Sequence, residues 1–138
     1  MAKVSGLGDT VSVDDSGGSA RAISNDITDF SINLPQALLD VAGVDKSAQE
    51  RLIGLGDGTV TLNGVTNFAS NQSHDVFKTR TGTRTVTITL YEDGSGDPQL
   101  GMEMLVGNYD ITRGTDGSST WTATLQLQSG TVPTWGTS

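Results

Sequence analysis

The sequence contains no cysteine and has few aromatic and few basic residues. Without cysteine the chain can form no disulfide, no thiolate metal site and no cysteine nucleophile. Aromatic residues make up 5% and apolar residues 34% of the 138 residues, so we expect a small core built mainly from Val, Ile and Leu. A chain of this length forms a single domain, residues 1–138, which excludes a two-domain enzyme with a cleft between its domains.

Basic residues are half as frequent as acidic ones, with 8 Lys and Arg against 16 Asp and Glu and a formal net charge of −8. Such a surface repels phosphate, so stable nucleic-acid binding is disfavoured. The sequence also lacks an apolar run of the length that a signal peptide or a membrane-spanning helix needs. We therefore expect synthesis in a cytoplasm and no membrane span.

Glycine and threonine are abundant, a pairing that is typical of short strands joined by tight turns. Alternating apolar and polar residues predict strands at 84–90 and 120–128. Between them the apolar positions of residues 100–111 change phase near Gly107 and Asn108, which predicts one long strand with a bulge. Turn-forming residues separate these segments, so the second half is predicted to be a three-stranded antiparallel meander.

In the first half of the sequence, the spacing of apolar residues predicts a short strand around Val11 and Val13. It also predicts a longer strand over 23–34 with a second bulge. The alternating residues 59–62 run into Asn63-Gly64, a strong hairpin signal, with Val65 and Thr66 in the returning strand.

One short helix is predicted over about residues 46–55, where Ser47 and Glu50 form a capping box. The spacing of residues 34–44 fits a helix or a strand, and Pro35 favours an extended edge segment. Residues 67–82 show no sustained period, which predicts a long loop with one helical turn at 73–77.

The residues with catalytic or metal-binding chemistry form no recognisable site. The Asp-Ser-Gly-Gly within residues 14–18 resembles a trypsin-type nucleophile, but the chain is too short for that fold, so a β-turn is the better interpretation. His74, beside Asp75, is the single histidine, and a zinc site would then need three carboxylates. Residues 93–97 lack the spacing of a calcium loop, and the glutamates form no glycosidase motif. We predict no enzymatic activity, no bound metal and no cofactor.

Short segments spread over nearly the whole chain carry a family resemblance. They are Lys3-Val4-Ser5-Gly6-Leu7-Gly8-Asp9, Ile23-Ser24-Asn25-Asp26-Ile27-Thr28-Asp29-Phe30, Asp45-Lys46-Ser47-Ala48-Gln49-Glu50-Arg51-Leu52, Thr61-Leu62-Asn63-Gly64-Val65, Ser73-His74-Asp75-Val76-Phe77 and Gly130-Thr131-Val132-Pro133-Thr134-Trp135. Together these segments resemble the tail tube, or major tail, protein of long-tailed, siphovirus-like bacteriophages.

The resemblance implies a mainly β fold, a β-sandwich or half-barrel of antiparallel strands with one short flanking α-helix. It further implies a structural protein of the virion tail, made in the host cytoplasm. Six copies would close into a ring, and rings would stack into a tube through which the genome leaves the capsid. Its partners would be further copies, the tape measure and tail-end proteins, and double-stranded DNA that passes without binding.

An acidic lumen fits this picture because it repels DNA phosphates over about 8 Å at physiological salt. The polar faces of residues 84–90 and 120–128 are expected to line the lumen. The candidate lumen acids lie on or beside the predicted meander and are Glu92, Asp93, Asp97, Glu103 and Asp110.

Contacts between rings are expected in the 67–82 loop, in an N-terminal arm of residues 1–8 and in a C-terminal arm of about residues 130–138. Trp135 is an aromatic residue among small polar ones and would anchor well in a neighbouring subunit. The candidate interface residues are Leu7, His74, Asp75, Phe77 and Trp135.

Two other function classes remain open at the level of sequence. A capsid decoration or head-completion protein is also small, acidic and β-rich, but it binds a shell and does not polymerise alone. A carbohydrate-binding or adhesion β-sandwich module would need exposed aromatic residues, of which this chain has few.

Overall fold

The computed structural model describes residues 7–90 and 96–137. These residues form a mainly β fold of antiparallel strands with one short α-helix, as expected. The elements in chain order are β1 (Thr10–Asp14), β2 (Ala20–Ala22), the 3-10 turn η1 (Ser24–Asp26), β3 (Ile27–Asn33), β4 (Gln36–Asp40), β5 (Arg51–Gly56), β6 (Thr59–Val65), α1 (Ser73–Phe77), β7 (Arg84–Thr89), β8 (Pro98–Arg113), β9 (Ser119–Leu127) and β10 (Trp135–Thr137).

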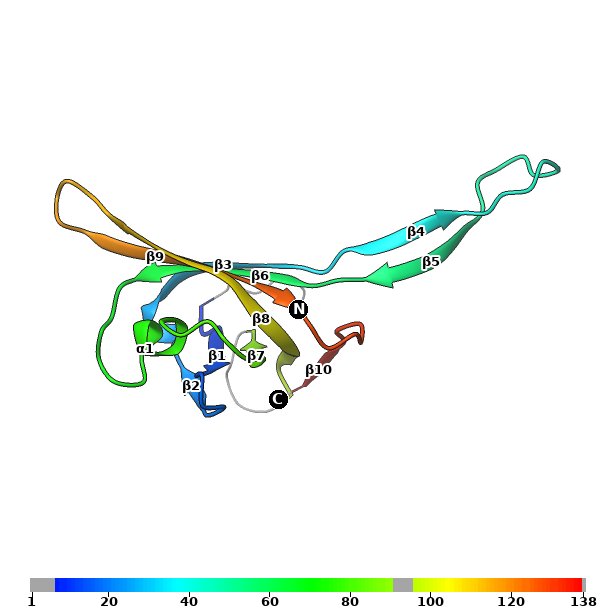
Figure 1. The fold of residues 1–138 in the computed structure, drawn as a ribbon. Helices are drawn as coiled ribbons and strands as arrows, with labels where there is room; N and C mark the ends of the chain where they lie inside the picture. Colours follow the sequence, from blue (N-terminus) through cyan, green and yellow to red (C-terminus); the bar gives the residue numbers. More distant parts are fainter. Residues whose placement is uncertain (1–6, 91–95, 138) are drawn as a thin grey trace.

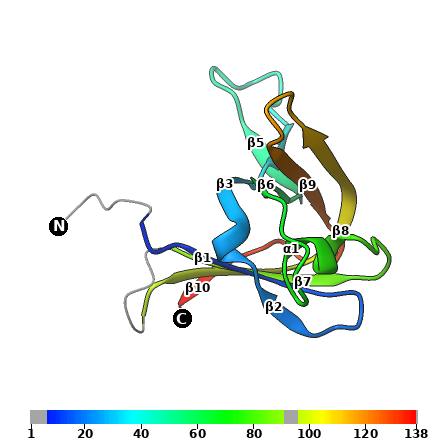
Figure 2. The ribbon, with the colours of Figure 1, turned by 90° about the vertical axis from the view of Figure 1, so that its left-hand side faces the viewer.

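The long strand β8 joins two layers of one bent sheet, whose strand order is β2-β1-β7-β8-β9-β6-β3 (Figures 1 and 2). Layer A consists of β3, β6, β9 and residues 104–113 of β8. Layer B consists of β2, β1, β7, β10 and residues 98–104 of β8. The predicted bulge is confirmed, because the β8–β9 register shifts between Val106 and Asn108. The shift changes the phase of β8 between the two layers.

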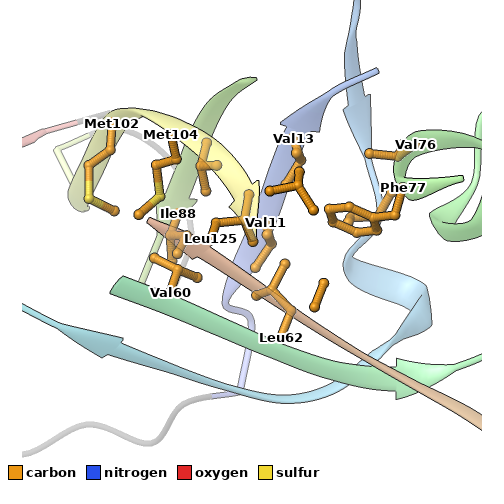
Figure 3. Packing of buried hydrophobic residues seen from close by; sticks show 14 of the residues in the cluster. Val11, Val13, Val60, Leu62, Val76, Phe77, Ile88, Met102, Met104 and Leu125 are labelled. Carbon is orange, nitrogen blue, oxygen red and sulfur yellow. The ribbon is translucent and has the colours of Figure 1, made fainter. Parts of the chain in front are cut away.

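The core lies between the two layers, where their apolar faces meet (Figure 3). Alternation along each strand supplies these side chains, and α1 adds two more at one end of the sandwich. The buried apolar residues are Val11, Val13, Ile23, Val60, Leu62, Val76, Phe77, Val86, Ile88, Leu100, Met102, Met104, Val106, Trp121, Ala123 and Leu125.

A buried arginine ties the loop around α1 to layer B. Arg84 is 0% exposed, and its guanidinium donates to the carbonyl oxygens of Asp14 at 3.0 Å and Val76 at 2.7 Å. It also donates to the carbonyls of Thr79 and Thr81. Burial lowers the pKa of Arg84 from its ordinary value, but a guanidinium stays charged and so needs these acceptors.

Gly64 marks the closest approach of two chain segments. A Cβ atom at this position would lie 2.0 Å from the carbonyl oxygen of Asp26 and 2.9 Å from the Trp121 ring. The Trp121 indole donates to the carbonyl of Val65 at 3.0 Å, which fixes the ring beneath the strand. Glycine is therefore needed at residue 64 for packing.

The predicted helix over residues 46–55 is wrong. Residues 51–56 form strand β5, which pairs with β4 in a separate two-stranded sheet. Gly54 and Gly56 disfavour a helix, and the extended partner strand supplies the ladder hydrogen bonds. The extended edge segment predicted over residues 34–44 is confirmed by β4.

The predicted hairpin turn at Asn63-Gly64 is also wrong, because β6 runs straight through both residues. Asn63 donates to Asp29 on β3 and accepts from Thr122 on β9, so neighbouring strands hold it in the sheet. The single helical turn predicted at 73–77 is confirmed by α1. The longer strand predicted over 23–34 begins only at Ile27, after η1, and shows the predicted bulge next to that residue.

Candidate assembly interface

A hairpin of β4 and β5, which we call the arm (residues 35–57), projects away from the body of the molecule (Figures 1 and 2). Its strands pair only with each other in the described part of the chain. Every residue of β4 and β5 except two glycines is exposed. The exposed residues include large apolar side chains, among them Ile53 at 69% and Leu55 at 89%.

The arm is apolar on both faces. Leu38 lies opposite Ile53, and Leu39 lies opposite Leu52. Opposed residues share a face and successive residues alternate, so Leu38 and Ile53 lie on one face of the hairpin and Leu39 and Leu52 lie on the other. An isolated two-stranded hairpin is marginally stable in water, and exposed apolar surface of this kind marks a protein contact. Both faces of the arm thus present exposed apolar side chains.

Layer A has two strand edges that are unpaired in the described part of the chain. One edge of β3 has no neighbour beyond β6, and residues 105–113 of β8 have no neighbour on the side away from β9. Unpaired edges are a liability in a lone subunit, and pairing with another chain removes them. Layer A is thus a four-stranded sheet that is open at both sides.

The outward face of layer A is polar and carries acidic side chains. Asp29, Asn63, Thr122 and Asp110 lie side by side across the four strands. The Asn63 amide donates to the Asp29 carboxylate at 2.6 Å, and the Thr122 hydroxyl donates to the Asn63 amide oxygen at 2.8 Å. These bonds link three of the four side chains across β3, β6 and β9.

The five candidate lumen acids do not lie together. Asp110 is exposed on the polar face of layer A, whereas Glu103 is exposed on the outward face of layer B and accepts from the Thr85 hydroxyl at 2.7 Å. Asp97 is half-buried just before β8, and Glu92 and Asp93 lie outside the described residues.

Strands β7 and β9 likewise belong to different layers (Figure 2), and their polar faces point away from the shared core, so the two faces do not form one continuous surface within the subunit. Sequence reasoning missed Asp29, although its alternation with the apolar Phe30 and Ile32 is the signal for a polar outward face.

The candidate interface residues occupy three kinds of position. Leu7 is 82% exposed and Trp135 is 47% exposed, with Trp135 in β10, paired to β8 of the same chain. His74 and Asp75 are half-buried on α1. Phe77 is 0% exposed, stacks on Tyr109 and packs at a tilt against Trp121, so the prediction that it is a surface contact is wrong. Its aromatic ring closes the end of the core instead.

The α1 residues are held by specific contacts. The His74 ring shares a hydrogen bond of 3.1 Å with the Tyr109 hydroxyl and packs edge-on against Phe68 at 4.9 Å between ring centroids. The ammonium of Lys78, with a backbone hydrogen bond from Asn71, lowers the pKa of the Asp75 carboxyl from its ordinary value. Sequence reasoning also missed Phe68, which is 70% exposed at this place.

Within residues 7–90 and 96–137, no three acidic or histidine side chains gather closely enough to hold a metal ion. No helix in the same ranges is long and apolar enough to cross a membrane.

The fold is found in known particle tails. A chain from the tail of an empty gene transfer agent particle, reconstructed with C6 symmetry, matches with a TM-score of 0.75 and 11% identity, covering 97% of this chain and 99% of that chain. A chain from the virion of a native gene transfer agent matches with a TM-score of 0.73 and 12% identity over 97% of this chain and 99% of that chain. A chain from the sixfold-symmetrised baseplate of the anti-feeding prophage matches with a TM-score of 0.62 and 16% identity over 100% of this chain and 96% of that chain.

No protein-family model matches the sequence, and no curated protein matches it in sequence. The three structural matches cover nearly the whole chain, so the chain has the fold of subunits in particle tails and baseplates. The tail-tube-like fold expected from the sequence is confirmed.

Proposed function

We propose that this chain is a structural tail tube subunit that assembles into hexameric rings, which stack into a hollow tube in the virion tail. The observation that carries the proposal is the open, four-stranded layer A, polar on its outward face and apolar on its inner face. The neighbour from the gene transfer agent tail was reconstructed with C6 symmetry, which supports six copies in a ring.

The ring closes when the free edges of layer A pair between neighbouring copies. The β3 edge of one copy would pair with the β8 edge of the next, so that six copies form a barrel of about 24 strands. With strands about 4.8 Å apart and tilted by about 40°, such a barrel is about 50 Å across between backbones. A channel of this size is open and admits double-stranded DNA.

The polar face of layer A would then line the channel. Asp29 and Asp110 place two carboxylates per subunit on this face. In a ring these carboxylates repel DNA phosphates over about 8 Å at physiological salt, so the duplex slides without binding. The tape measure and tail-end proteins would be further partners of the assembled tube.

The arm supplies the contact that holds neighbouring copies together. Because both of its faces are apolar, it is best covered when it lies between two other subunits. A heterologous contact of this kind, in which one surface binds a different surface of the next copy, extends along an axis without a second protein.

Negative-stain microscopy with light scattering on the purified chain, from about 1 µM to 1 mM, tests the proposal. Hollow rings or tubes are the expected result. A particle that stays monomeric at every concentration and salt would overturn self-assembly and favour a decoration protein or a glycan-binding module.

A further inference from the structure

The proposed function does not say which surface of a neighbouring copy the arm contacts. The arm lies at one end of the molecule, and α1, β2 and the turn between β8 and β9 lie at the other end (Figure 1). In a head-to-tail assembly one end of a subunit must fit the opposite end of the next. The α1 end is therefore the first place to look for a surface that complements the arm.

The arm is net acidic, whereas the α1 end carries both acidic residues, among them Asp75 and Asp116, and basic residues. The arm carries four acidic residues against two basic ones, a net charge of −2 within residues 35–57. The exposed residues Lys78, Arg80 and Arg113 lie at the α1 end, although the whole chain has a net charge of −8. Lys78 pairs with Asp75 at 2.6 Å, whereas Arg80 and Arg113 have no ion-pair partner among the described residues. Two arginines at this end are thus available to carboxylates of another chain.

The α1 end also presents apolar surface that is anchored in the core. Phe68 is 70% exposed and Ile111 is 47% exposed. Phe68 packs edge-on against the ring of His74. His74 is hydrogen-bonded to the Tyr109 hydroxyl, and the Tyr109 ring packs against the buried Trp121. A rigid aromatic side chain on a well-packed support is the usual anchor of a protein interface.

We propose that the arm of one copy docks on a patch of a second copy formed by Phe68, Lys78, Arg80, Ile111 and Arg113, which we call the acceptor patch. The inference rests on the proposed function and names the partner surface within it. The leucines and isoleucine of the arm cover Phe68 and Ile111, and the arm carboxylates face the arginines. Apolar burial supplies most of the affinity, and the charges fix the direction and register of docking.

A charge exchange tests the acceptor patch. The variant R80E/R113E reverses the two unpaired arginines and leaves the Lys78–Asp75 ion pair intact. Replacing two attractive pairs with repulsive ones is expected to raise the critical concentration for assembly by about 5- to 30-fold. The variant D45K/E50K reverses the charge of two acidic residues of the arm and is expected to raise the critical concentration by a similar factor. A chain that carries all four substitutions, R80E/R113E and D45K/E50K, restores attraction between the arm and the patch. Its critical concentration is expected to return to within about threefold of the wild-type value.

A matched control separates docking from net charge. The combination of R80E/R113E with D45K/E50K restores the formal net charge of −8, and so does the combination of R80E/R113E with E103K/D110K, which leaves the arm unchanged. Recovery only in the first combination supports the acceptor patch. Recovery in both, or in neither, overturns it, and circular dichroism checks that each variant is folded.

The outcomes also distinguish this inference from the function on which it rests. Tubes from the wild-type chain with no effect of R80E/R113E would overturn the acceptor patch and leave the tail tube function standing. A wild-type chain that never assembles would overturn both.

Because the chain has no cysteine, chemical cross-linking gives an independent readout on a clean background. A V44C arm variant is mixed with an R80C patch variant and treated with a flexible bismaleimide. The expected product is a V44C–R80C heterodimer, and a T61C variant on the polar face of layer A serves as the control partner. Equal cross-linking of V44C to R80C and to T61C would contradict the proposed docking.

Discussion

The apolar arm makes the sharpest prediction about assembly. In the double variant L38S/I53S, one apolar face of the arm becomes polar. Leu38 is 62% exposed and Ile53 is 69% exposed in the single subunit, so this is the surface that a neighbour would cover. Fully burying one such side chain is worth about 1.5–3 kcal/mol, which gives about 2–4 kcal/mol per subunit for the exposed share of both. The critical concentration for tube formation should therefore rise by about 30- to 1,000-fold.

The same variant should leave the folded subunit almost unchanged. The two side chains lie outside the core and face each other on an exposed hairpin, where a cross-strand pair contributes about 0.2–1 kcal/mol locally. The thermal midpoint should fall by no more than about 2–4 °C. The swapped variant L38I/I53L keeps the apolar area and is the matched control, with assembly expected at the wild-type concentration.

Sedimentation across a concentration series measures the critical concentration, and differential scanning calorimetry measures the midpoint. If L38S/I53S assembled at the wild-type concentration, the arm would not be a buried contact, and the argument from its two apolar faces would fail. If the midpoint fell steeply, the arm would instead be part of the cooperative core.

Three further predictions concern the fold of the subunit. Replacing Arg84 by Met leaves several buried carbonyls without a donor and should cost about 3 kcal/mol or more, measured by urea unfolding with R84K as the milder comparison. Gly64→Ala places a Cβ atom 2.0 Å from a backbone oxygen and should cost at least about 3 kcal/mol, whereas Gly101→Ala meets no atom within 4 Å and should change stability by less than about 0.5 kcal/mol in the same assay. Hydrogen bonds from the Ser19 amide and then the Arg21 side chain lower the pKa of Asp15, so the stability from this carboxylate is present above its ordinary value of 3.8 and is lost as the pH falls through the lowered pKa. D15N should therefore unfold at a lower temperature than the wild-type chain at pH near 7, with the difference vanishing near pH 2, and an equal difference at both pH values would contradict this account.

The periodicity of the sequence determined much of the sheet. Residues 84–90 and 120–128 alternate over a full strand length, so their buried faces and the three-stranded meander could be predicted. The phase change in residues 100–111 was enough to predict the bulge in β8, because one inserted residue moves every later side chain to the opposite face. Composition alone also indicated a single acidic, β-rich domain without a disulfide.

The errors arose where a local signal competed with a distant partner. Ser47 and Glu50 are correctly spaced for a helix cap, yet residues 51–56 pair with β4 as a strand. Asn63-Gly64 is a turn signal in isolation, but Gly64 is small because Asp26 and Trp121 approach it from both sides. Local propensity is worth a fraction of a kilocalorie per residue, and tertiary contacts outweigh it.

The sequence by itself determined which residues alternate, where the turns of the meander in the second half fall, and that the chain is acidic. Only the tertiary structure decided which layer each polar face belongs to, that Phe77 is buried, and that the apolar residues of 36–56 form an arm without a covering layer. The physical reason is that alternation fixes a side chain's face relative to its own strand, whereas burial depends on which other strands lie against that face.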